Sequence, residues 1–185
     1  MKDKHTLRAK KEGYEARSAY KLFAINRKFR ILQKHNKVLD IGCWPGSWLQ
    51  VCLKFQAKPV GVDKKKTFIQ GVETFTADIL EDSIFDKLQS YGKFDVILSD
   101  VAPSTSGKIE IDQYKSYELS SRAFEIARKV LKEKGNFVVK IFQGEEAVEL
   151  FQELKKNFRL VKSFKPEASK KRSKEVYYVC LGYKG

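Results

Sequence analysis

The chain has 185 residues, of which 42% are hydrophobic and 12% aromatic, enough for a single domain (residues 1–185) with a substantial core. Its 37 Lys and Arg exceed its 23 Asp and Glu by 14, and this excess favours a polyanionic partner such as a nucleic acid. No apolar run approaches the roughly 20 residues of a membrane-spanning helix, which excludes an integral membrane protein.

The cysteines and histidines do not have the spacing of a metal site or of a disulfide framework. Cys43, Cys52 and Cys180 are odd in number, and His5 and His35 are isolated. We therefore expect no metal, and a reducing, intracellular compartment.

The chain opens with basic segments. Residues 1–16 form a basic arm, which either contacts phosphates or is the remnant of an organelle presequence. Residues 17–32 alternate apolar and basic side chains at helical spacing, which predicts an amphipathic helix with a basic face. A solvated surface helix would have the same pattern.

Residues 38–51 are the stretch around which the predicted fold is organised. The apolar strand 37–42 breaks at a turn from Gly42 to Gly46, and apolar residues then restart at near-helical spacing. Strand, tight loop and helix form the first βα turn of a nucleotide-binding sheet, where glycines and a helix amino terminus admit a ligand. Trp44 stands where a dinucleotide fingerprint needs glycine, so a nucleotide-dependent oxidoreductase ranks last.

Strands and helices alternate along the rest of the chain. Further strands are expected at 58–63, 72–77, 94–100, 136–142, 158–164 and 176–183, and helices at 79–91, 112–134 (capped by Gly135) and 145–157. The pattern predicts a seven-stranded, mostly parallel sheet covered by helices on both faces. The connection 64–71 is too short for an ordinary crossover helix.

Three aspartates stand at or just after successive strand ends: Asp63, Asp78 and Asp100. In an open α/β sheet the ligand crevice lies beyond these ends. Ionised carboxylates accept hydrogen bonds, which suits a ribose diol, an amino group or a cationic centre. Each aspartate alone could equally cap a helix or form a turn.

Lys140 is the most unusual residue, because it lies inside an otherwise apolar strand. A desolvated lysine beside other cations has its pKa lowered from about 10.4 toward 7 to 8, as a general base requires. The alternative is a lysine that snorkels from an edge strand. The basic loop 165–175, which ends on Glu175, suits phosphates or is a solvated charge run.

Together these residues resemble the FtsJ/RrmJ family of S-adenosylmethionine-dependent RNA ribose 2′-O-methyltransferases. The resemblance rests on five blocks in the same order, at 17–22, 40–48, 99–107, 138–144 and 165–177. It implies a Rossmann-like class I methyltransferase fold. The implied catalytic tetrad is Lys21, Asp100, Lys140 and Glu175. The implied cofactor contacts are Gly42, Gly46, Trp48, Asp63, Asp78 and Asp100.

The resemblance also implies a substrate and a mechanism. The blocks at 99–107 and 138–144 are closer to the ribosomal RNA branch than to the tRNA branch, which implies a uridine ribose of large-subunit ribosomal RNA, free or in the assembled subunit. Lys140 would take the proton of the 2′-hydroxyl beside bound S-adenosylmethionine. Two departures, Cys43-Trp44 in the glycine loop and a short segment after Asp63, would reshape the adenosyl pocket.

Several alternatives stay open. The chain could methylate tRNA or an mRNA cap, or bind RNA during ribosome assembly without catalysis. A monomer is expected. Cytoplasm, nucleolus, mitochondrion or another organelle would each suit an enzyme acting on RNA.

Overall fold

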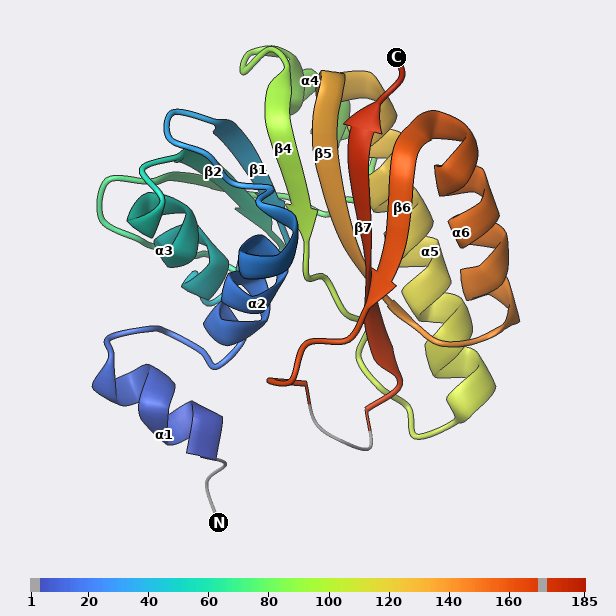
Figure 1. The fold of residues 1–185 in the computed structure, drawn as a ribbon, viewed down its shortest axis with the longest axis horizontal. Coiled ribbons are helices and arrows are strands. Elements are labelled where there is room, and N and C mark those ends of the chain that lie inside the picture. Colours follow the sequence, from blue (N-terminus) through green and yellow to red (C-terminus); the bar gives the residue numbers. More distant parts are fainter. Residues whose placement is uncertain (1–3, 170–172) are drawn as a thin grey trace.

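The computed structural model describes residues 4–169 and 173–185. The strands are β1 (Lys37–Ile41), β2 (Lys58–Asp63), β3 (Glu73–Thr76), β4 (Phe94–Ser99), β5 (Leu131–Phe142), β6 (Phe158–Phe164) and β7 (Glu175–Tyr183). The helices are α1 (Lys4–Lys11), α2 (Ala19–Phe29), α3 (Ser47–Lys54), α4 (Ser83–Gln89), α5 (Ile109–Val130) and α6 (Glu145–Asn157). One sheet holds all the strands, with helices packed on both faces (Figure 1).

The sheet order is β3-β2-β1-β4-β5-β7-β6. β7 runs antiparallel to both of its neighbours, and the other pairs are parallel. The predicted seven-stranded, mostly parallel α/β sheet is therefore confirmed. The reversal brings the first residue of β7 to the edge where the parallel strands end, as the pairing of Phe142 with Glu175 shows.

Strand alternation divides the core between the two faces of the sheet. Phe137, Val139 and Ile141 belong to the cluster that includes residues of α5 and α6. Val138, between them, belongs to the cluster of α2 and α3 on the opposite face. Because side chains alternate along a strand, Lys140 points to the same face as Val138. That face also carries the start of α3, directly after the glycine loop (Figure 1).

The boundary between α5 and β5 differs from the sequence prediction. The helix ends at Val130 instead of 134, and Gly135 does not cap it, because Leu131 already pairs with Phe94 of β4. The β4–β5 register then shifts before Asn136. A Cβ atom on Gly135 would lie 2.9 Å from the main-chain oxygen of Asp95, so glycine is required for close approach at this bulge.

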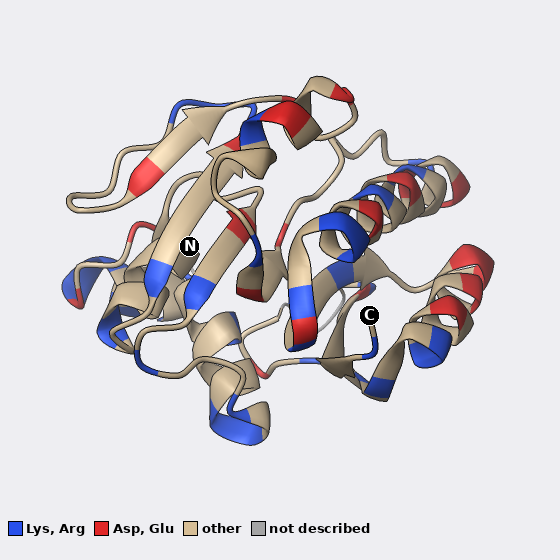
Figure 2. Ribbon diagram, turned by 90° about the horizontal axis from the view of Figure 1, so that it is seen from above, with Lys and Arg blue, Asp and Glu red and all other residues tan. Residues whose placement is uncertain are grey.

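Other predicted elements agree more closely. Lys4–Lys11 of the predicted basic arm form α1, and the predicted helix 17–32 is observed as the shorter α2, Ala19–Phe29. β3 joins the sheet parallel to β2 after a nine-residue connection, 64–72, without a helix. Figure 2 shows Lys and Arg distributed over many elements instead of gathered on one. Among the described helices, none has the length and apolar character to cross a bilayer.

Candidate active site

Lys140 and Asp100 meet at the carboxyl edge of β4 and β5. The Lys140 ammonium donates to the main-chain oxygen of Asp100 at 2.6 Å and to its Oδ1 at 3.0 Å. The two side chains are only 6% and 16% exposed. Asp100 directly follows β4, whose last residue Ser99 is in register with Val139, one residue before Lys140. Sheet pairing therefore fixes this contact.

A second ion pair joins α2 to β7. The Lys21 Nζ lies 2.5 Å from Oε1 of Glu175, and both side chains are nearly buried. The Ser169 hydroxyl donates to the same carboxylate oxygen at 2.9 Å. The reversed direction of β7 is what brings Glu175 to this edge. The four residues of the predicted tetrad thus come from α2, β5, β7 and the residue directly after β4.

Tyr177 joins the two pairs, and sequence reasoning did not single it out. Its hydroxyl donates to Oδ1 of Asp100 at 2.7 Å, its ring lies 5.7 Å from the Lys21 Nζ, and its residue pairs with Lys140 across β5 and β7. Burial, with the charge of Asp100, raises the Tyr177 pKa well above its usual range, so the hydroxyl stays a donor. The signal was its position two residues after Glu175, on the same strand face.

Opposing effects act on the Asp100 carboxyl. Burial alone would raise its pKa, but the charges of Lys140 and Lys21 and the hydrogen bond from Tyr177 outweigh burial and hold the pKa below its ordinary value. Asp100 is therefore a carboxylate at neutral pH. It accepts hydrogen bonds from an amine and a phenol at one oxygen, which orients Lys140.

A cavity of about 620 Å³ opens at the carboxyl ends of the strands, beside this cluster. Gly42, Asp63 and Asp100 line it, together with residues that follow β3 and β4. Trp44 also lines it and is 51% exposed, with the Lys65 Nζ 4.1 Å from its ring centroid. The volume is within the usual range for small-molecule sites.

Two glycines of the loop after β1 allow close packing: Gly42, which lines the cavity, and Gly46, which lies outside its lining. A Cβ atom on Gly42 (φ 78°) would lie 2.8 Å from Val101 Cα, and one on Gly46 (φ 116°) would lie 2.5 Å from Ile69 Cδ1. These glycines let the loop backbone pack closely. Asp63 accepts from the main-chain nitrogen of Trp44 at 3.0 Å, which holds the loop against the end of β2. The residues therefore fit S-adenosylmethionine.

Two other predicted cofactor residues, Asp78 and Trp48, do not line this cavity and have partners within the protein. Asp78 forms a 2.7 Å ion pair with Lys64. Burial would raise the Asp78 pKa, but the bond and charge of Lys64 together with the Leu80 amide outweigh burial and lower it. The Trp48 indole is 2% exposed and donates to the main-chain oxygen of Ser18 at 2.9 Å. It packs against Tyr177, so its side chain connects α3 to α2 below the cavity.

Asp40, beneath the glycine loop in β1, is fully buried. Neither of its carboxylate oxygens has a hydrogen-bond partner among the described residues. Burial, and then the charges of Asp100 and Asp63, raise its pKa well above the ordinary value. Burial therefore favours the protonated form of Asp40.

A reversed seventh strand in this sheet order, with a ligand cavity at the ends of β1, β2 and β4, defines a methyltransferase of the Rossmann-like class. The chain belongs to the FtsJ-like methyltransferase family, whose model matches residues 14–183. The family resemblance found in the sequence is thus confirmed.

Relatives cover nearly the whole chain. A ribosomal RNA large subunit methyltransferase E from Archaeoglobus fulgidus is 43% identical over 97% of this chain and 96% of its own length. The protein of the same name from Wolbachia pipientis is 41% identical over 100% of this chain and 97% of its own length. The crystal structure of a Plasmodium falciparum protein assigned as a ribosomal RNA methyltransferase superposes with a TM-score of 0.84 at 33% identity, covering 93% of this chain and 100% of that one.

Proposed function

We propose that this protein methylates a ribose 2′-hydroxyl of large-subunit ribosomal RNA, at a uridine, with S-adenosylmethionine as the methyl donor. The observation that carries the proposal is the contact of Lys140 with Asp100, since Asp100 also lines the cavity that fits the donor. Relatives named for the same activity match almost the full chain. Such an enzyme works inside the cell or one of its organelles.

When bound, S-adenosylmethionine supplies a methyl group that is attached to a sulfonium. The ribose oxygen bonds to this methyl group as the carbon–sulfur bond breaks. The task of the protein is to place that hydroxyl and remove its proton. Lys140 is the proton acceptor, and its side chain is held by two oxygens of Asp100. A lysine accepts a proton only as a free amine.

The remaining tetrad residues position the reacting groups. Glu175 fixes Lys21 through the 2.5 Å ion pair, and Ser169 fixes Glu175. Lys21 thereby presents a hydrogen-bond donor close to Asp100, where it orients the ribose. Residues Gly42, Gly46, Trp48, Asp63, Asp78 and Asp100 form the proposed cofactor-binding set. Holding the reactants in one orientation can supply on the order of 7 to 11 kcal/mol of the barrier.

The decisive experiment compares methyl transfer by the wild-type protein and by Lys140→Ala. Labelled S-adenosylmethionine is supplied with purified large subunits, free ribosomal RNA or tRNA, and the modified nucleotide is mapped. We expect transfer to ribosomal RNA and a loss of at least about 10²-fold in rate for the variant. Calorimetry should show nearly unchanged cofactor binding.

The other outcomes separate the alternatives. Retained turnover in Lys140→Ala would refute the role of this lysine as the base. Methyl transfer to tRNA alone would show that the substrate is tRNA and not ribosomal RNA. RNA binding without any transfer by the wild-type protein would identify a non-catalytic assembly factor.

A further inference from the structure

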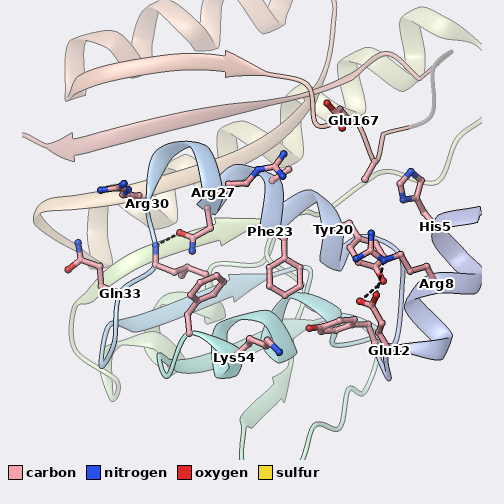
Figure 3. A pocket seen from close by; sticks show the side chains of 16 residues that line it. His5, Arg8, Glu12, Tyr20, Phe23, Arg27, Arg30, Gln33, Lys54 and Glu167 are labelled. Carbon is pink, nitrogen blue, oxygen red and sulfur yellow. Dashed lines mark hydrogen bonds and ion pairs between the residues drawn. The ribbon is translucent and has the colours of Figure 1, made fainter.

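A second cavity, of about 870 Å³, lies on the other side of α2 from the tetrad. Residues of α1, α2 and α3 form its walls, with Glu167 and Ala168 at one edge. Figure 3 shows Phe23 of α2 in the middle of this cavity, with Arg8 and Glu12 on the α1 side and Lys54 on the α3 side. The proposed reaction uses none of these side chains.

Aromatic side chains form the floor of the second cavity. Phe23 is partly buried, with the ring of Tyr14 edge-on at 5.6 Å and the ring of Phe55 tilted at 6.0 Å. Tyr20 completes this floor and is fixed by its hydrogen bond to Glu12 and by the Arg8 guanidinium 4.8 Å above its ring. Aromatic rings that are fixed in this way suit stacking with a nucleobase.

Cations stand along the rim above this floor. Arg27 follows Phe23 by about one turn of α2, and Arg30 is the residue directly after this helix. Lys54, the last residue of α3, lines the cavity on the other side of Phe23 (Figure 3). These three cationic side chains are exposed and have no hydrogen bond or ion pair within residues 4–169 and 173–185. Of the acids that line the cavity, Glu12 is engaged by Arg8 and Tyr20, while Glu167 lies at the opposite edge.

Consecutive residues of two segments connect this cavity to the tetrad. Tyr20 lines the cavity, and the next residue, Lys21, pairs with Glu175 in the tetrad. Ala168 lines the cavity, and the next residue, Ser169, donates to that same Glu175. An extended polyanion that reaches the tetrad across these two segments would place its adjoining unit over Phe23.

We propose that the second cavity binds an unstacked nucleotide of the substrate RNA close to the methylated ribose. Its base stacks on Phe23, and the flanking phosphates contact Arg27, Arg30 and Lys54. An aromatic floor with an unpaired cationic rim matches a single-stranded nucleic acid in both shape and charge. The inference rests on the proposed function, because it assigns the substrate RNA of that reaction to this surface.

The test measures binding of a fluorescently labelled single-stranded oligoribonucleotide over a range of salt concentrations. The variants are Phe23→Leu and the double variant Arg27→Gln/Arg30→Gln, and the control is Lys156→Ala, an exposed lysine on α6. Calorimetric binding of S-adenosylmethionine verifies that each protein is folded. The arginine positions are exposed, so the double variant keeps the test valid if Phe23→Leu fails to fold.

We expect Phe23→Leu to bind the RNA about tenfold more weakly with an unchanged salt dependence, since stacking is not ionic. The double variant should reduce the slope of log K against log salt by about one for each phosphate contact removed. The control should bind like the wild-type protein. If both variants bind the RNA with the affinity and the salt dependence of the wild-type protein, this inference is wrong and the proposed function still stands. The cavity would then bind a protein partner instead of RNA. Altered binding in the variants, but no methyl transfer by the wild-type protein, would contradict the proposed function alone.

Discussion

The buried carboxyl of Asp40 leads to a prediction about stability and pH. The Asp40 side chain is fully buried, has no hydrogen-bond partner among the described residues, and lies near two other acids. Replacing it by Asp40→Asn keeps the shape but removes the group that can ionise. We expect the variant to gain stability relative to the wild-type protein as the pH rises.

The sign of this stability change follows from the direction of the Asp40 pKa shift. The folded state holds the Asp40 proton more tightly than the unfolded state, in which the pKa is near its ordinary value of 3.8. The stabilisation from that proton is fully present below this value and is lost as the pH rises toward the folded pKa. Over this window the wild-type free energy of unfolding should fall, relative to the variant, by about 1.4 kcal/mol per pH unit.

Urea denaturation of both proteins from about pH 4 to pH 8 measures this difference. Asp95→Asn provides a control of opposite sign, because the Lys132 ion pair and the Lys37 amide outweigh burial and lower the Asp95 pKa. That variant should be less stable than the wild-type protein at neutral pH and should approach it as the pH falls. A constant difference between Asp40→Asn and the wild-type protein across the range would refute the reasoning.

Three further predictions concern the site. Tyr177→Phe removes a hydrogen bond to the Asp100 carboxylate, so single-turnover methyl transfer should slow by about tenfold with unchanged cofactor affinity, and an unchanged rate would exclude a positioning role. Gly46→Ala brings a Cβ atom against Ile69 in a left-handed backbone conformation, so calorimetry should show at least about tenfold weaker S-adenosylmethionine binding. Its control is Gly92→Ala, also left-handed but in open space; equal effects of the two would contradict the explanation. Trp48→Phe loses the bond to Ser18, so urea denaturation should show a loss of about 1 kcal/mol, and an unchanged stability would show that this bond does not stabilise the fold.

The positions of Lys140 and Asp100 were predictable because each depends on a local pattern. A lysine in an apolar strand and an aspartate at a strand end are visible in the sequence, and parallel pairing then brings them to one edge. The contact of Tyr177 with Asp100 depends on a strand that is reversed and lies far away in the chain, and no local pattern records that register.

At two further places, tertiary packing determines a structure that the local sequence does not predict. Leu131 and the polar residues after it suit a helix, yet the pairing of Leu131 with Phe94 starts β5 earlier than predicted, since sheet contacts outweigh helix propensity. The second cavity depends on α1 and its contacts with Tyr20, which composition alone could not place. Lys170, Lys171 and Arg172 of the predicted basic loop lie outside the described residues.

The reversed seventh strand has a consequence for how this enzyme could acquire new targets. Because β7 begins where the parallel strands end, the hairpin connection before it adjoins both the catalytic cluster and the aromatic cavity. The described part of that connection, 165–169 and 173–174, holds no strand of the central sheet, so its sequence can vary without disturbing the Lys140–Asp100 contact. Exchanging it between relatives, with Ser169 retained to hold Glu175, should redirect the choice of RNA while the chemistry stays the same.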